Sequence, residues 1–261
     1  MQLKPRQLLT KHPCRTRFSV VSALSAGVLF LFAAVAAHAA NVPEPVPKDN
    51  PGWQFAFRQN NNLAKEGGYD VLFLGDTLTH AWTFPAGGAP IWEAQLAPLK
   101  AVNFGISSDR IENVLYRIQN GHLDGKGDPK VIVLAIGAME NNNPYGGVPP
   151  ATVAAGIKAI IQEIKSRKPA VKIILMAIFP RGKTATDLRR KKNDEINALI
   201  TVFADNKTVF FKNINESLLN KNGSQRDDIF YEDGLYLRQS GYKIWADAII
   251  PDIKKHLPDP K

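Results

Sequence analysis

The sequence predicts an α/β domain built in three layers around a central parallel β-sheet. Two observations carry this prediction. Short runs that are apolar at every position, rather than at every second one, are typical of strands covered on both faces. Segments with a helical apolar period separate these runs, and such alternation is typical of a doubly wound domain. The strand-like runs are Val71–Leu74, Ala101–Phe104, Val131–Ile136, Lys172–Ile178 and Thr208–Phe211.

The predicted helices lie between the later strand-like runs and after the last one. They are Ile111–Gln119, Ala151–Ser166, Leu188–Phe203 and Ser240–His256. Before the first strand, Asn41–Trp53 contains four prolines, which favour an extended lead-in because proline fixes φ and lacks a backbone donor. We expect this lead-in and a first helix to occupy residues 40–67 and the α/β domain to occupy residues 68–261.

The first 39 residues have the composition of a secretory signal peptide. Five basic residues precede an almost uncharged apolar run, Phe18–Ala36, and Ala37-His38-Ala39 offers the small-x-small pattern that signal peptidases cleave. We therefore expect export, with a periplasmic or extracellular mature protein that begins at Ala40. The alternative is an uncleaved anchor, because about 19 apolar residues can just span a bilayer. The chain would then meet the membrane through its leader alone.

Charge and cysteine content exclude several functional classes. The chain carries 33 basic and 24 acidic residues, and loss of the five basic residues of the leader leaves a net charge of +4. That charge does not indicate nucleic-acid binding. The single cysteine, Cys14, lies in the leader, so the mature chain would have neither a disulfide nor a thiol nucleophile. Because no group of residues has the spacing of metal ligands, we expect no metal and no other cofactor.

Three polar segments follow the first three strand-like runs. They are Gly75–Thr77, Asn103–Asp109 and Ile136–Asn143. In a doubly wound fold the ligand site lies beyond the carboxyl ends of the strands. We therefore expect the chemistry of this protein at these segments.

The order and spacing of five sequence blocks resemble those of the SGNH (GDSL) hydrolases, and most of all their platelet-activating factor acetylhydrolase-like branch. The blocks are GDTLTH, NFGISSDRIENVLYRIQNG, VIVLAIGAMENN, IFPRG and YEDGLYLRQSGYKIWADAI, and the resemblance covers roughly Tyr69–Ile249. It implies a flavodoxin-like α/β/α sandwich and a site for ester hydrolysis. In that family a serine attacks the ester. A glycine amide and an asparagine side chain complete the oxyanion hole, and a late Asp-x-x-His supplies acid and base.

The resemblance places substituted residues at most of these positions. The serine position falls on Thr77, the oxyanion glycine on Ser108 and the asparagine on Met139. The late motif falls on Asp233 to Tyr236, which retains the acid and replaces the base by tyrosine. A tyrosine hydroxyl, with a pKa near 10, cannot act as a base near neutral pH, and methionine cannot donate a hydrogen bond. Loss of a triad histidine lowers kcat by roughly 10⁴ to 10⁶.

Several positions allow a second interpretation. Thr77 could simply N-cap the following helix. His80 lies three residues after Thr77 on one helix face and could act as an improvised base, or it could line the cleft. Asn141 or Asn142 could take the asparagine position if the loop slipped, although Gly137 favours the register that places Met139 there. Asp76 is an accessory candidate, which could pair with Asp233 around a bound sugar or cation.

Further residues have ordinary structural interpretations. Ser107 and Ser108 can be turn residues ahead of the helix that follows. We expect His122 at the surface after a helix end, and a solvated helix start across the basic stretch Arg181–Glu195. Trp82 and Trp92 could line the cleft or belong to the core, and the core is favoured for Trp92.

Two hypotheses follow. The first is an exported SGNH-fold protein without Ser-His-Asp esterase chemistry, acting as a binding module or as a silent subunit of a homo- or heterodimer. Its cleft would hold an acylated small molecule or glycan, and its boundary would be Asp76, Thr77, Ser108, Met139, Asp233 and Tyr236. The second is a weak carboxylic-ester hydrolase, similar to a lipase or an acetylesterase, in which Thr77 attacks and His80 is the base.

Overall fold

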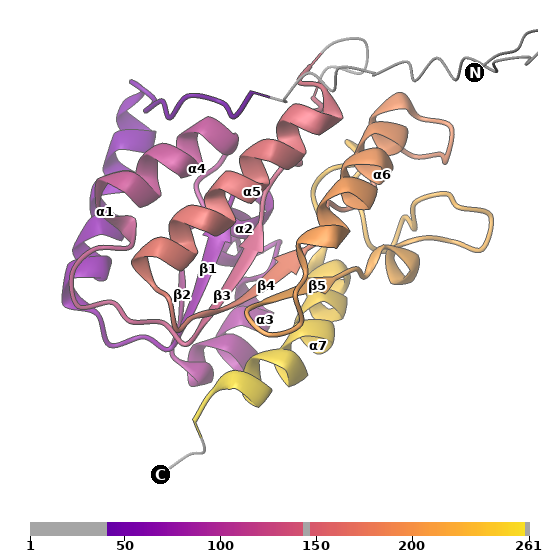
Figure 1. Ribbon diagram of the computed structural model, residues 1–261. Coiled ribbons are helices and arrows are strands. Elements are labelled where there is room, and N and C mark those ends of the chain that lie inside the picture. Colours follow the sequence, from indigo (N-terminus) through magenta and orange to yellow (C-terminus); the bar gives the residue numbers. More distant parts are fainter. Residues whose placement is uncertain (1–40, 143–146, 259–261) are drawn as a thin grey trace, which may run out of the picture. The chain divides into compact units, whose positions relative to one another are not determined.

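A computed structural model describes residues 41–142 and 147–258, which form a five-stranded parallel sheet with the strand order β2-β1-β3-β4-β5 (Figure 1). The strands are β1 (Val71–Gly75), β2 (Ala101–Asn103), β3 (Val131–Ala135), β4 (Lys172–Met176) and β5 (Val209–Lys212). Leu72 of β1 lies opposite Val102 of β2 and Ile132 of β3. All five predicted strands are confirmed, and their ends differ from the prediction by at most two residues.

Helices cover both faces of the sheet, as the three-layer prediction requires. Figure 1 shows α4, α5 and α6 over one face, and α3 and α7 on the other. The longer helices are α1 (Pro51–Glu66), α4 (Ile111–Arg117), α5 (Pro150–Arg167), α6 (Leu188–Ile200) and α7 (Gln239–His256), and the short ones are α2 (Thr77–His80) and α3 (Ala89–Ile91). This arrangement, with β1 and β3 as central neighbours, is the flavodoxin-like form of the doubly wound fold.

The lead-in ends earlier than the proline content predicts. Helix α1 begins at Pro51, and Asn50 caps it by accepting a hydrogen bond from the Trp53 backbone amide at 2.8 Å. Proline is favourable at the first helical position, because its missing donor would have no intrahelical partner there. The prediction of extended chain as far as Trp53 is therefore wrong for its last three residues.

The strands are almost entirely buried, and an aromatic cluster fills the space between the sheet and α7. The Trp82 side chain is fully buried and its ring lies 4.5 Å from that of Tyr242 and 5.1 Å from that of Trp245. The Trp92 ring packs edge-on against Phe73 at 5.0 Å. Both tryptophans belong to the core. This confirms the interpretation favoured for Trp92 and excludes Trp82 from the wall of a cleft.

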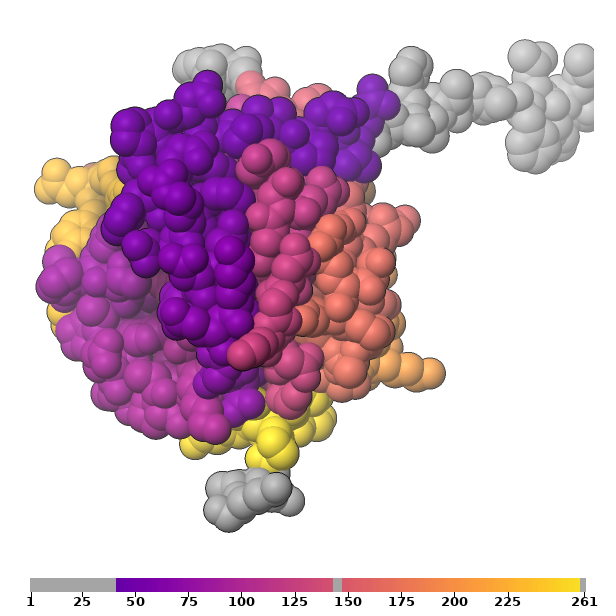
Figure 2. Space-filling model, turned by 90° about the vertical axis from the view of Figure 1, so that its left-hand side faces the viewer, coloured from indigo at the N-terminus to yellow at the C-terminus, as the bar shows by residue number. Residues whose placement is uncertain are grey.

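A buried polar network ties α4 to the ends of β1 and β2. Arg117 pairs with Asp109 through Nε and Oδ2 at 2.7 Å, and donates from Nη1 to the Phe104 carbonyl oxygen at 2.8 Å. The Nδ1 atom of His122 lies 2.8 Å from the same Nη1. The prediction of a surface position for His122 is wrong, because α1 covers this side of the domain (Figure 2). The Phe57 ring of α1 stacks on the imidazole, with 5.3 Å between the ring centroids.

The basic stretch after β4 is only partly solvated. Asp187 caps α6, and Arg190 is buried, donating to the carbonyl oxygens of Gly182 at 2.9 Å and Gly223 at 3.1 Å. Arg181 is buried as well. The prediction of a solvated helix start is therefore wrong for these two arginines. For Arg190 the reason is that the chain around Gly223 folds back over it.

The expected signal peptide lies outside the described residues. Within 41–142 and 147–258, no helix combines the length and the apolar character that a membrane crossing requires.

Candidate functional site

The loop after β1 builds the first part of the site. Asp76 caps α2 by accepting a hydrogen bond from the Leu78 amide at 3.0 Å, and Thr77 is the first residue of the helix. Tyr242 of α7 donates to the Leu78 carbonyl oxygen at 2.8 Å and holds the helix in place. The interpretation of Thr77 as the N-cap is therefore wrong. Its hydroxyl is free to face the loops after β2 and β3.

The Thr77 hydroxyl has two partners. Its Oγ1 accepts a hydrogen bond from the Ser108 amide at 2.6 Å and donates to the Met139 sulfur at 3.3 Å. The three residues expected at the oxyanion positions thus lie together around one hydroxyl. A thioether is a weak acceptor and takes no proton at neutral pH, so neither partner can activate Thr77.

His80 contacts the hydroxyl of Ser107 rather than that of Thr77. Its Nδ1 lies 2.8 Å from Ser107 Oγ. Its ring packs edge-on against the Phe84 ring, with 5.1 Å between the two ring centroids. No imidazole in the described residues forms a hydrogen bond with Thr77. Burial lowers the pKa of the His80 imidazole, although the charge of Asp109 opposes the effect. The predicted Thr77–His80 pair is therefore not formed.

The late motif keeps its acid and its tyrosine on one loop. Asp233 Oδ1 accepts hydrogen bonds from the amides of Leu235 at 2.8 Å and Tyr236 at 3.1 Å, so the carboxylate folds onto its own turn. Burial and the charge of Asp233 raise the pKa of the Tyr236 hydroxyl. Tyr236 consequently stays protonated at neutral pH and cannot replace the expected histidine.

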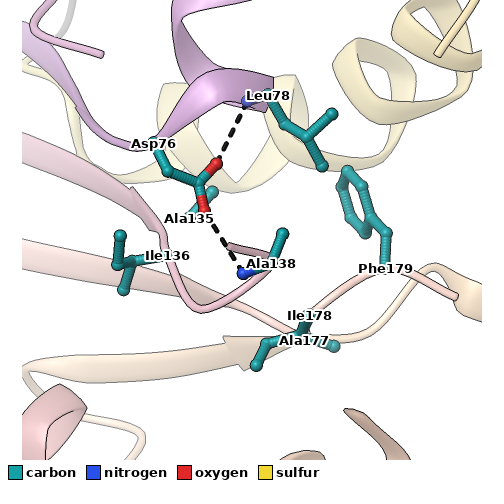
Figure 3. Close-up of a pocket in the computed structure, with 8 residues that line it drawn as sticks. All are labelled: Asp76, Leu78, Ala135, Ile136, Ala138, Ala177, Ile178 and Phe179. Atoms are coloured by element: carbon teal, nitrogen blue, oxygen red, sulfur yellow. Dashed lines mark hydrogen bonds between the residues drawn. The ribbon is translucent and has the colours of Figure 1, made fainter. Parts of the chain in front are cut away.

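Asp76 lies at the floor of the site. Its carboxylate accepts hydrogen bonds from the amides of Leu78 at 3.0 Å and Ala138 at 3.2 Å, and burial raises its pKa to about 7 (Figure 3). Apolar side chains, including Ile136 and Phe179, surround a cavity of about 10 Å³ beside it. This volume suffices for about one water molecule, so an acyl group cannot bind there.

The loop after β3 keeps the register that Gly137 favours. Gly137 has φ of 111°, and a Cβ atom there would lie 2.6 Å from the Ile178 side chain, so glycine fits where larger residues do not. Asn141 is fully buried and donates to Asn193 Oδ1 at 2.8 Å. Asn142 Nδ2 lies 3.8 Å from the Met139 sulfur. Neither asparagine takes the place of Met139, so the slipped-loop alternative is wrong.

An open groove of about 650 Å³ begins beside Asp233 and Tyr236. Its lining combines aromatic and small apolar side chains with charged ones. It is lined by Ala81, Phe84, Ala86, Gly87, Tyr231, Glu232, Asp233, Tyr236, Leu237 and Arg238. Sites for small molecules are typically of this size and composition.

Two residues of the site escaped the sequence-based prediction. Ser107 appeared there only as a turn residue, and Arg181 only as part of a basic stretch. Arg181 is 9% exposed, and its Nε and Nη1 have no hydrogen-bond partner among the described residues. Burial lowers the pKa of its guanidinium, and the charges of Asp233 and Asp76, which oppose this effect, show that it lies near these two site residues. The sequence carries no signal for either role, because both depend on contacts between segments far apart in the chain.

The family model of the GDSL-like lipases and acylhydrolases matches residues 73–244. The chain belongs to this family. Within it, the α2 subunit of platelet-activating factor acetylhydrolase IB from Rattus norvegicus is 39% identical over 133 residues, which are 51% of this chain and 53% of the relative. The chain thus spans about half the length of that relative. The human α1 subunit is 32% identical over 174 residues, 66% of this chain and 70% of the relative.

A solved structure supports the same fold for this GDSL-like family member. The GDSL-like lipase from Bacteroides thetaiotaomicron superposes with a TM-score of 0.60 and 19% identity, and the match covers 77% of this chain and all of the other, 100%. The sequence relatives place the chain in the platelet-activating factor acetylhydrolase-like branch. In the described part of the chain, no three His, Cys, Asp or Glu side chains are grouped as a metal site would need.

Proposed function

We propose that this member of the GDSL-like family is an exported protein that binds an acylated small molecule or glycan without cleaving it through Thr77. One observation carries the proposal: the Thr77 hydroxyl is held between the Ser108 amide and the Met139 sulfur. The resemblance adds that the sequence position expected for the base holds Tyr236. Without a base the hydroxyl stays protonated and is a poor nucleophile. The composition of the leader supports export.

The oxyanion positions support the same proposal. The Ser108 amide donates to Thr77 Oγ1, and Met139 has no donor to offer. Removal of one oxyanion donor typically costs a factor of about 10² to 10³ in kcat. Together with a missing base, this loss makes ester hydrolysis at Thr77 slower than that of a complete triad by several orders of magnitude.

The groove beside Tyr236 is the proposed ligand site. Phe84, Tyr231 and Tyr236 offer aromatic surfaces that suit an acyl chain or the apolar face of a sugar. The guanidinium of Arg238 lies 4.4 Å above the Tyr231 ring and rigidifies this wall. Carboxylates of Glu232 and Asp233 can accept hydrogen bonds from sugar hydroxyls. A role as a silent subunit of a dimer is compatible with the relatives, which are named as subunits.

The alternative is a weak carboxylic-ester hydrolase, lipase- or acetylesterase-like, that uses Thr77 with His80 as base. It needs an imidazole nitrogen within bonding distance of Thr77 Oγ1. The structure disfavours this alternative, because Nδ1 of His80 lies against Ser107.

Turnover of p-nitrophenyl acetate by the mature chain tests the proposal. We expect Thr77→Ala to leave kcat/KM within twofold of the wild type, since Thr77 is inert. Thr77→Ser, the matched control, should not raise kcat/KM either, because a serine at this position would still lack a base. A loss of more than tenfold in Thr77→Ala would overturn the proposal in favour of the Thr77 hydrolase.

Ligand binding needs its own measurement. Ligand-detected NMR with methyl butyrate and with N-acetylglucosamine should give a signal from at least one of them, weakened in Tyr236→Ala. Absence of both signals would contradict the binding role.

A further inference from the structure

Ser107 and His80 form a hydroxyl–imidazole pair that is independent of Thr77. Ser107 Oγ lies 2.8 Å from His80 Nδ1, and both residues are half-buried, so that solvent reaches them. This distance is the one at which a base can take a proton from an attacking hydroxyl. It is also the only hydrogen bond between a serine and a histidine in the described residues.

The turn that carries Ser107 is fixed at both ends. Its Asp109 amide donates to the Ile106 carbonyl oxygen at 3.2 Å, and Ser108 has φ of 63°, as a type II turn requires at its third position. The Asp109 carboxylate is held by Arg117 at 2.7 Å and by Trp53 Nε1 at 2.6 Å. Ser107 is therefore presented by a rigid turn rather than by a loose loop.

The histidine side of the pair is fixed as well. The loop after β2 runs so close to α2 that a Cβ atom on Gly105 would lie 2.3 Å from the His80 amide nitrogen. Asn103 Nδ2 donates to the Thr79 carbonyl oxygen at 2.8 Å and joins the two segments. The Phe84 ring packs edge-on against the imidazole. A site whose groups are held on rigid elements is pre-organised for reaction.

The pair also has a place for a substrate. Phe84, which contacts the His80 ring, and Ala81, which follows His80, both line the groove of about 650 Å³. Lys48 Nζ donates to the Ser108 carbonyl oxygen and lies 3.8 Å from Asp109 Oδ1, so a positive charge stands on the same turn. The groove thus reaches the residues next to His80, and half-buried Ser107, the other member of the pair, is open to solvent.

We propose that Ser107 and His80 are a slow hydrolytic dyad for short acyl esters such as acetyl esters. Ser107 Oγ attacks the acyl carbon while its proton passes to His80 Nδ1, and the imidazolium then protonates the departing alkoxide. Water, deprotonated by His80, attacks the acyl-serine. The carboxylic acid leaves and the serine regains its proton. One ester and one water give one alcohol and one acid.

The dyad is expected to be slow because His80 lacks an orienting carboxylate. No carboxylate in the described residues forms a hydrogen bond with the His80 imidazole, and Asp109 is already paired with Arg117. Since the orienting acid of a triad contributes up to about 10⁴ to the rate, we expect a turnover far below that of a complete triad.

The test combines hydrolysis of p-nitrophenyl acetate with active-site labelling of the wild-type chain. Diisopropyl fluorophosphate should label the peptide that contains Ser107, with loss of fluoride, as shown by peptide mass mapping. Ser107→Ala and His80→Gln should each lower hydrolysis above the buffer rate at least tenfold. Ser217→Ala, which removes an exposed serine on a distant turn, should leave it unchanged.

Four results would overturn the dyad: no hydrolysis above the buffer rate, unchanged hydrolysis in Ser107→Ala, no label on the wild-type chain, or a label on another residue. Labelling of the wild type does not depend on the folding of any variant. A label on Thr77 would refute both this inference and the proposed function, whereas absence of any label would refute the dyad alone.

Discussion

At the scale of single residues, Ser108 shows how the site differs from the one the resemblance implies. It has φ of 63° at the position expected for the oxyanion glycine. Most residues with a Cβ atom, serine among them, are strained in this left-handed region, by roughly 1–2 kcal/mol. The backbone thus keeps the conformation that suits glycine, while the residue is serine.

Replacement of Ser108 by glycine should therefore stabilise the fold. We expect Ser108→Gly to raise the free energy of unfolding by about 0.5–1 kcal/mol, because relief of strain exceeds the added entropy of the unfolded chain. Urea denaturation measures this change. Asn206→Gly is the matched control, since Asn206 has φ of 54° but asparagine tolerates this region, and its gain should be smaller. A lower free energy of unfolding in Ser108→Gly would contradict the claim that Ser108 strains the folded backbone.

At the scale of elements, the junction of β1 and α2 couples stability to pH. Asp76 is fully buried at this junction and its pKa is raised to about 7 from 3.8. In the unfolded chain Asp76 loses its proton near pH 4, whereas in the folded chain it keeps the proton up to about pH 7. Because the folded state binds more protons between these values, its stability falls as pH rises through this window.

Asp76→Asn removes the titrating group and should remove the effect. From pH 4 to pH 7 the wild type should lose stability relative to the variant by about 1.4 kcal/mol per pH unit. Below pH 4 and above pH 7 the difference in unfolding free energy between wild type and variant should not change with pH. Loss of the hydrogen bond to Ala138 shifts this difference by a constant amount at every pH. Urea denaturation across this range measures it. A difference that stays constant, or that favours the wild type with rising pH, would refute the raised pKa.

Elements were predictable from the sequence where local pattern decides them. The uninterrupted apolar runs identified all five strands, because a strand covered on both faces needs no polar positions. Burial of His122, Arg181 and Arg190 was not predictable. A long polar side chain is buried only when distant segments, such as α1 over His122, fold across it.

At the scale of the whole molecule, the fold brings the predicted oxyanion positions together, but it pairs His80 with Ser107 instead of Thr77. The strand order places the loops after β1, β2 and β3 side by side, so Thr77, Ser108 and Met139 meet as the family resemblance implies. Spacing along α2 suggested that His80 would serve Thr77. The approach of Gly105 to α2 instead presents Ser107 to the imidazole, and a close contact between two loops cannot be derived from spacing.

The most direct measurement is hydrolysis of p-nitrophenyl acetate by a variant that carries Thr77→Ser, Ser108→Gly, Met139→Asn and Tyr236→His. The triple variant that retains Tyr236 is its control. If the hydroxyl at position 77 is inactive because a base is missing, the fourfold variant should be much faster than both the wild type and the triple variant. We expect its kcat to be higher by a factor of about 10³ or more. Equal activity in the threefold and fourfold variants would contradict the claim that the absent base is what keeps this site inactive.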